Sequence, residues 1–139
     1  MATMVKFLDF VEQLGLGEHN LDADTLNFAL TDTLPVNTQT VFDDSVDHAA
    51  PSAANGYTTG GHDATATWGE SGGVATLDGS QVTITATAGG IGPFQYIVLY
   101  NDTNATDRLV TYYDHGSSIT LADGESFIID IPTNIFTLE

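Results

Sequence analysis

Three carboxylates and one imidazole gather near the middle of the chain. They lie within six residues of one another, at Asp43, Asp44, Asp47 and His48. Hard cations such as Ca²⁺ prefer oxygen ligands of this kind. The spacing matches no known cation-binding loop, and an acidic, solvated loop explains these residues more simply. This run is therefore a weak candidate for a metal site.

A second run of oxygen-bearing side chains lies further along the chain, at Asp102, Asn104, Thr106 and Asp107. Its alternation is similar to the start of a Ca²⁺-binding loop, but it lacks the Gly and the closing Glu of an EF-hand. A turn rich in Asn and Asp is the simpler interpretation, because these side chains hydrogen-bond to nearby backbone. We expect no metal and no other cofactor.

The remaining chemistry-bearing residues do not form a catalytic pattern. The histidines, at positions 19, 48, 62 and 115, are separated in sequence and mostly sit beside turn residues, so we expect surface or turn histidines. His115 follows Asp114 and precedes two serines, but the chain contains no G-x-S-x-G nucleophile motif. The Gly60-Gly61 pair has no Lys after it, unlike a phosphate-binding loop. The sequence therefore predicts a protein that is not an enzyme.

The charge of the chain is strongly one-sided. Lys6 and Arg108 are its only strong cations, against 19 acids, and the formal net charge is -17 at pH 7. A protein that binds nucleic acid displaces counterions from phosphates with Lys and Arg, and two such residues are too few. Binding to an anionic membrane surface is disfavoured for the same reason. We expect neither nucleic acid nor membrane as a partner.

Size and composition predict one β domain with an N-terminal arm. The chain has 139 residues, 42% of them hydrophobic, and no Cys, so its core must form without disulfides. Its apolar runs are shorter than the roughly 18 to 20 residues of a membrane-spanning helix. The N-terminus lacks the pattern of a signal peptide. We expect residues 1–17 to form the arm and residues 18–139 the domain.

The arm has the period of a short amphipathic helix. Over residues 5–14 the apolar side chains recur at the spacing of one helical face, at Phe7, Phe10, Val11 and Leu14. Glycines at positions 15 and 17 are natural stops for a helix. Two alternatives stay open: the helix packs on the end of the domain, or it docks on a neighbouring subunit. Phe7 and Phe10 are therefore candidate interface residues.

From residue 21 onward the apolar pattern changes to a period of two. Residues 25–30 alternate, with Leu26, Phe28 and Leu30 facing inward. A short edge strand is expected over residues 40–42. Residues 43–61 form a long polar loop, and loops of this length in compact domains are functional or mobile. This loop is the first place to look for a partner-binding surface.

The second half of the chain alternates between short strands and turn signals. Strands are expected at residues 64–68, 74–77, 82–85, 96–100, 109–113, 118–121, 127–131 and 135–138. Asp78-Gly79 is a hairpin signal between the second and third of these. Turns about every ten residues predict an all-β fold, an antiparallel β-sandwich of the jelly-roll or Ig-like Greek-key type.

The longest apolar run, residues 96–100, is the expected central strand. Alternation places Ile97 and Leu99 on one face, where they would form the inter-sheet core. Tyr96 and Tyr100 lie on the other face, and their polar tips suggest contact with water or a neighbouring subunit. Trp68 is expected in the core or an interface. We therefore add these tyrosines and Trp68 to the interface candidates.

Several strings stand out along the chain after its helix-like start. They are residues 17–21 (GEHNL), residues 24–31 (DTLNFALT), residues 55–61 (NGYTTGG), the strand that contains LYND, and the hairpin DHGSSITLADGESF. These strings, in this order, resemble a family of small virion proteins of tailed bacteriophages. The likeness is densest over residues 91–131 and extends from about residue 7 to residue 138.

The resemblance implies a structural role, most directly that of a head decoration (cement) protein. Such a protein would bind the major capsid protein on the outer capsid surface of the virion and would associate with itself as a homotrimer. One alternative is a tail, neck or fibre-base protein with the same fold. Another is an extracellular carbohydrate- or Ca²⁺-dependent binding module, suggested by Trp68, the tyrosines and the acidic loops.

Overall fold

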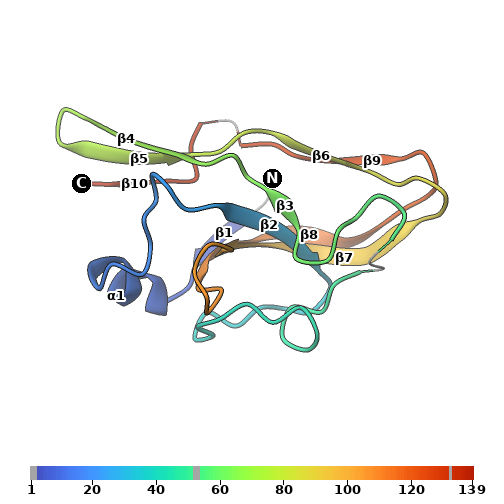
Figure 1. The fold of residues 1–139 in the computed structure, drawn as a ribbon. Helices are drawn as coiled ribbons and strands as arrows, with labels where there is room; N and C mark the ends of the chain where they lie inside the picture. The colour runs from blue at the N-terminus through green and yellow to red at the C-terminus, as the bar shows by residue number, and fades with distance from the viewer. Residues whose placement is uncertain (1–2, 52–53, 132) are drawn as a thin grey trace.

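The computed structural model describes residues 3–51, 54–131 and 133–139 and shows a chain built mainly of strands (Figure 1). The strands in these ranges are β1 Thr3–Lys6, β2 Leu26–Thr31, β3 His62–Asp63, β4 Thr67–Ser71, β5 Val74–Asp78, β6 Val82–Thr85, β7 Ile91–Asn101, β8 Leu109–Leu121, β9 Ser126–Ile129 and β10 Phe136–Leu138. One short helix, α1, spans Asp9–Gly15. No helix among the described residues has the length and apolar character needed to cross a membrane. The all-β prediction is confirmed.

Antiparallel pairing arranges the strands in three sheets. The largest has five strands in the order β1-β8-β7-β2-β3. A three-stranded sheet, β10-β5-β4, and a two-stranded sheet, β6-β9, lie over one face of it (Figure 1). Side chains from both layers meet between them, with Phe28 and Leu99 from the large sheet and Leu77 and Ile84 from the smaller ones. We call this cluster the inter-layer core.

The predicted central strand and the predicted alternation of β2 are both confirmed. β7 lies in the middle of the five-stranded sheet, between β8 and β2. It is longer than the predicted five residues, because Ile91 and Phe94 also pair with β8. Ile97 and Leu99 belong to the inter-layer core. The three side chains of β2 that were expected to face inward are fully buried there.

The two strands expected over residues 109–113 and 118–121 are a single strand, because β8 runs from Leu109 to Leu121. Gly116 has a φ of +94°, and the Asp114 carboxylate accepts its N–H at 2.7 Å. This positive φ and this side-chain hydrogen bond are typical of a turn, but they do not end the strand, because Asp114 and Ile119 on either side both pair with β7. Local turn signals therefore give way to pairing with the central strand.

The N-terminal segment differs from the predicted helix over residues 5–14. Residues 3–6 form β1 and pair with β8, with Val5 opposite Tyr112. Val5 packs on the face of the five-stranded sheet that points away from the two smaller sheets, and Phe7 is fully buried on the same face. The helix begins only at Asp9, and Val11 is exposed. A helix with only four apolar residues on one face is weakly stable by itself. Residues 3–6 therefore pair with the edge of the sheet instead of joining the helix.

The predicted hairpin at Asp78-Gly79 is wrong. β5 pairs with β4 and β10, whereas β6 pairs with β9, so the chain crosses here from one small sheet to the other. The hairpin turn lies instead at Gly72-Gly73, where both glycines have positive φ. A Cβ on Gly79 would lie 3.0 Å from the Ile131 side chain, so this glycine permits close packing.

The strand expected over residues 64–68 is displaced along the chain, since β3 ends at Asp63 and β4 begins only at Thr67. Between them Thr65 has a φ of 47°, and the Asp63 carboxylate accepts its N–H at 2.7 Å. Ala64 is fully buried in the inter-layer core. The chain therefore leaves the large sheet at this point and enters the other layer.

The outer face of the five-stranded sheet is covered by irregular chain. Residues 32–51 run across it, in the cyan part of the ribbon (Figure 1). Phe42 stacks on Tyr100 with ring centroids 4.0 Å apart, and His48 stacks on Phe42. The strand expected over residues 40–42 is reduced to one bridge between Val41 and Arg108. This cover closes a second apolar group, the outer cluster, made of Phe7, Ala29, Tyr96, Val98, Tyr100, Leu109 and Tyr112.

Candidate functional site

An apolar cavity lies where α1 meets the edges of two sheets. Its volume is about 260 Å³, and we call it the edge pocket. The strands β1 and β10 that border it are both edge strands. Strand alternation turns Met4 and Lys6 toward the pocket and Val5 away from it. Most of its lining is apolar, including Met4, Phe10, Val11, Leu14, Phe136 and Leu138.

Large apolar side chains around the edge pocket are exposed to solvent. The exposed fraction is 41% for Met4, 55% for Val11 and 50% for Leu138. Leu8 and Leu16, which flank α1, are exposed as well. Exposed apolar side chains gathered at a concave site are typical of a surface that binds another molecule.

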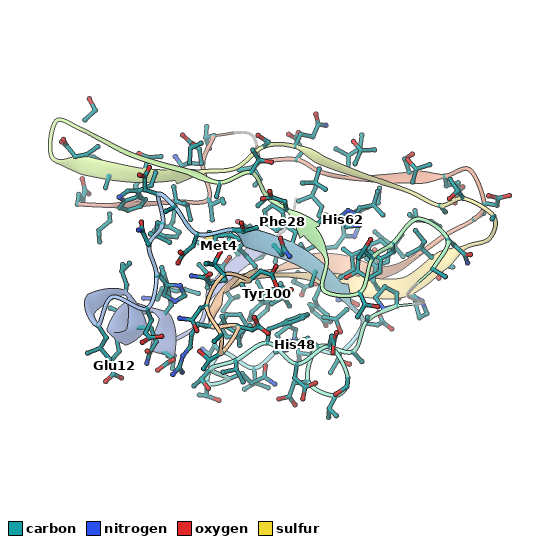
Figure 2. The ribbon with its side chains drawn as sticks, viewed as in Figure 1. Met4, Glu12, Phe28, His48, His62 and Tyr100 are labelled. Atoms are coloured by element: carbon teal, nitrogen blue, oxygen red, sulfur yellow. The ribbon has the colours of Figure 1, made fainter. Side chains whose placement is uncertain are left out.

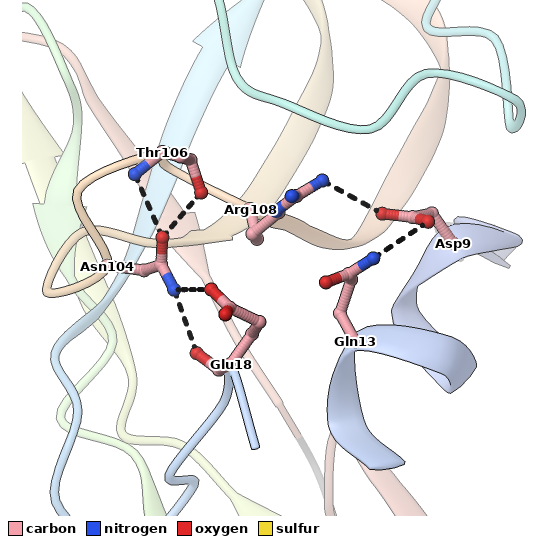
Figure 3. Close-up of polar contacts among 6 residues, drawn as sticks. All are labelled: Asp9, Gln13, Glu18, Asn104, Thr106 and Arg108. Atoms are coloured by element: carbon pink, nitrogen blue, oxygen red, sulfur yellow. Dashed lines mark hydrogen bonds and ion pairs between the residues drawn. The ribbon is translucent and has the colours of Figure 1, made fainter. Parts of the chain in front are cut away.

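The edge pocket also holds one of the two strong cations of the chain. Lys6 lines it, is exposed, and forms no ion pair with any residue that the structure describes. Arg108, in contrast, reaches Asp9 at the start of α1, with Nη1 3.3 Å from Oδ2 (Figure 3). Gln13 donates to the other oxygen of the same carboxylate at 3.2 Å. The edge pocket therefore combines apolar side chains with an available positive charge.

The two predicted acidic runs meet in space beside Tyr100. Asp43 and Asp44 line the same polar hollow as Asp102 and Asp107. Burial raises the pKa of Asp107, and the neighbouring carboxylates of Asp102 and Asp44 raise it further. Within the described ranges no group of three or more His, Cys, Asp or Glu side chains is arranged to hold a metal ion.

The weak metal candidates Asp47 and Asn104 do not line this hollow. Nδ2 of Asn104 donates to the Glu18 backbone oxygen at 3.0 Å and to its carboxylate at 2.7 Å (Figure 3). The N–H of Thr106 donates to Asn104 Oδ1 at 2.8 Å. The same kind of turn occurs at Asp43, where hydrogen bonds from Ser45 lower the pKa of the carboxyl group. These side chains stabilise turns, in agreement with the simpler interpretation.

A buried amide, that of Asn101, joins the segment after α1 to the turn after β7. Its Oδ1 accepts the N–H groups of Thr103 and Asn104 at 3.0 and 3.2 Å. Its Nδ2 donates to Asp24 Oδ2 at 2.6 Å and lies 3.2 Å from His19 Nδ1. Sequence reasoning found the turn and missed these last two partners, because they lie 77 and 82 residues away in the chain.

The expectation of surface or turn histidines is confirmed only in part, because His48 lies in a turn but not at the surface. His115 is exposed, but His48 is fully buried, His19 is buried, and His62 is half-buried. Their rings pack edge-on or stack on aromatic side chains, as His48 does on Phe42 and His19 on Phe10. Burial lowers the pKa of these three histidines.

Four of the five interface candidates are covered by the chain itself. Phe7, Tyr96 and Tyr100 are buried in the outer cluster, and Phe10 is buried at the floor of the edge pocket. Tyr100 does not face water, because its hydroxyl donates to the Gly60 oxygen at 2.6 Å and its ring lies under Phe42. Tyr96 keeps an exposed fraction of 9%. Trp68 is half-buried beside Phe136, with ring centroids 6.2 Å apart. Figure 2 labels Tyr100 within this packing and Met4 on β1, the edge strand of the large sheet.

Comparisons with protein-family models, curated proteins and solved structures find no match to this chain.

Proposed function

We propose that this chain is a structural virion protein of a tailed phage that decorates the outside of the capsid. Its partner would be the major capsid protein, and the edge pocket would be the surface that binds it. The proposal begins from the strings that resemble small virion proteins. The observation that carries it is the edge pocket, where exposed apolar side chains surround a cation in a chain of net charge -17. We further propose that the two layers form a sandwich of the jelly-roll or Ig-like type.

The charge distribution supports the edge pocket as the contact surface. A surface rich in carboxylates resists association with other acidic surfaces, because like charges placed opposite each other across an interface disfavour binding. Met4, Val11 and Leu138 offer apolar area that is exposed in the free protein. Because about half of each side chain is already covered, burying the rest of one of them contributes about 1 kcal/mol to a complex. A homotrimer would carry about three times the charge, so contacts between its copies also need a surface of this kind.

Co-sedimentation with undecorated heads of the encoding phage tests the proposal. The double variant Met4→Ser, Val11→Ser removes apolar area from the edge pocket, and we expect it to bind heads at least about tenfold more weakly. The double variant Val36→Ser, Val46→Ser is the matched control, because these exposed valines lie on the segment that covers the outer face. Thermal unfolding of each variant shows that the fold is retained.

Three results separate the alternatives. Weaker binding by the pocket variant alone supports the edge pocket as the contact surface. Unchanged binding by both variants means that another surface contacts the capsid. Wild-type protein that binds isolated tails and not heads would overturn the decoration role in favour of a tail, neck or fibre-base protein.

A further inference from the structure

The side-chain amide of Asn101 is held in one orientation. Its Oδ1 accepts two backbone N–H groups, those of Thr103 and Asn104, and its Nδ2 donates to Asp24 at 2.6 Å. Turning the amide over would place its NH2 group against two N–H donors and its oxygen against a carboxylate. Its Nδ2 can therefore meet His19 Nδ1, 3.2 Å away, only as a donor.

His19 must then be a neutral ring that accepts through Nδ1 and carries its proton on Nε2. The side chain is buried, and its Nε2 has no hydrogen-bond partner among the described residues. The ring packs edge-on against Phe10 of α1, with centroids 5.0 Å apart. Burial and the donor group of Asn101 both favour the uncharged form of this imidazole.

We propose that His19 and Asn101 form an acid-sensitive lock between residues 18–25 and the turn at residues 101–107. Protonation would put a hydrogen on His19 Nδ1, facing the NH2 group of Asn101, so that two donors would oppose each other. The held amide cannot turn to relieve this, so the contact must separate. Further bonds cross the same junction, from Thr25 N–H to Thr103 Oγ1 at 2.7 Å and from Asp102 N–H to the Thr25 oxygen at 2.9 Å. Asn104 Nδ2 also donates across it to the backbone and carboxylate oxygens of Glu18.

The charged groups around His19 come from each element packed against it. Asp24 and Glu18 of its own segment and Asp9 of α1 raise its pKa, and Arg108 lowers it. Burial is the largest influence and sets the net direction, a pKa below the ordinary value of 6.5. A histidine with a lowered pKa stabilises the closed junction fully above about pH 6.5, and this contribution is lost as the pH falls toward the lowered pKa.

The lock connects to the edge pocket through α1. Phe10 touches His19 on one side and lines the edge pocket on the other. Opening the junction would therefore remove part of the support under the helix that borders the pocket. The inference does not rest on the proposed function, because it concerns the junction whatever the edge pocket binds.

Nuclear magnetic resonance of the ¹⁵N-labelled protein tests the lock. At about pH 7.5 we expect His19 in the Nε2–H tautomer. Between about pH 7.5 and 5.5 we expect exchange protection of the Thr25 and Thr103 amides, corrected for intrinsic rates, to fall about tenfold. In the opened junction His19 would titrate with an ordinary pKa. One pH unit below that pKa the charged form exceeds the neutral form about tenfold, and opening becomes more favourable by the same factor. The amide of Val98 in the central strand should keep its protection.

Two variants isolate the histidine. His19→Asn keeps an acceptor near the Nδ1 position without titrating in this range, so its protection should not change with pH. His115→Gln removes an exposed histidine and should behave as the wild type does. The lock is overturned by an Nδ1–H tautomer, by equal protection at both pH values, or by parallel loss at Val98, which indicates global unfolding. If His19→Asn does not fold, the wild-type tautomer and exchange data still decide.

Discussion

The two faces of the five-stranded sheet are buried in different ways. Its inner face meets two smaller sheets, and the inter-layer core combines aliphatic and aromatic side chains from both layers. Its outer face is covered by residues 32–51, which hold no named strand. Aromatic rings take part in the covering, as Phe42 lies between Tyr100 and His48.

Because one face is covered by strands and the other by irregular chain, we expect the two faces to open in different ways. Strand pairing holds both layers of the inner face, so its side chains separate only when sheets come apart. The outer cover is joined to the sheet by isolated backbone bonds, such as Phe42 N–H to the Asp107 oxygen at 2.8 Å and Leu109 N–H to the Thr40 oxygen at 3.2 Å. Segments held by few such bonds open locally at lower free energy than the core does. We expect substitutions and pH to distinguish the two faces.

The largest effect is expected on the inner face, for Phe28→Ala. Phe28 is fully buried in the inter-layer core and is among the largest such side chains. Removing it leaves a cavity between paired sheets that cannot collapse, so the free energy of unfolding should fall by about 3 to 5 kcal/mol. Urea denaturation followed by circular dichroism measures this loss.

The exposed Val36 supplies the control for that measurement. Val36→Ala should change the free energy of unfolding by less than about 0.5 kcal/mol. A loss below about 1 kcal/mol for Phe28→Ala would mean that the layers move together to fill the space, and the contrast between the faces would then disappear.

An intermediate effect is expected at alkaline pH, from Tyr57 in the inter-layer core. Its hydroxyl accepts the Leu30 N–H at 2.9 Å, and burial raises its pKa to about 12. In the unfolded chain a tyrosine ionises near pH 10. The contribution of Tyr57 is therefore complete below about pH 10 and is lost as the pH rises toward 12, by roughly 2 to 3 kcal/mol.

Urea unfolding at a series of alkaline pH values measures this loss. Burial also raises the pKa values of Tyr96, Tyr100 and Tyr113, so the wild-type curve contains four such groups. Tyr57→Phe isolates the inner contribution, since the variant should lose less stability than the wild type above pH 10. Parallel curves for the two proteins would show that the Tyr57 phenol ionises freely in the folded state.

The features predicted correctly from sequence depend on periodicity along a single strand. The alternation in β2 and the two faces of β7 follow from the period of two, because a strand buried against a second layer must turn every other side chain inward. The failures involve competition between distant segments. Gly72-Gly73 and Asp78-Gly79 are comparable turn signals, and only the pairing of β5 with β4 and β10 shows which one forms a hairpin.

The candidate sites could be predicted only in part for the same reason. The scarcity of cations made Lys6 conspicuous, but its place beside α1 and β10 requires the fold. Tyrosines at alternate positions suggested a wet face, because nothing in residues 96–100 reveals that Phe42 stacks on Tyr100. The junction at Asn101 depends on His19 and Asp24, whose distance along the chain exceeds any local pattern.

The smallest effect is expected for Phe42→Leu on the outer face. Leucine keeps most of the apolar area but loses the stacking on Tyr100, whose ring is nearly parallel at an interplanar angle of 7°. An aromatic pair contributes about 0.5 to 1.5 kcal/mol beyond the area that it buries, so we expect a loss of about 1 kcal/mol. Urea denaturation measures it under the same conditions as for Phe28→Ala.

The same substitution on the inner face completes the comparison. Phe94 is fully buried and lies edge-on to Phe127, with ring centroids 5.0 Å apart. Phe94→Leu loses this pair and also leaves a space that two paired layers cannot fill, so it should destabilise the protein more than Phe42→Leu does. If Phe42→Leu proves equally costly, the cover of residues 32–51 is packed as rigidly as the layer of strands, and the outer face does not open first.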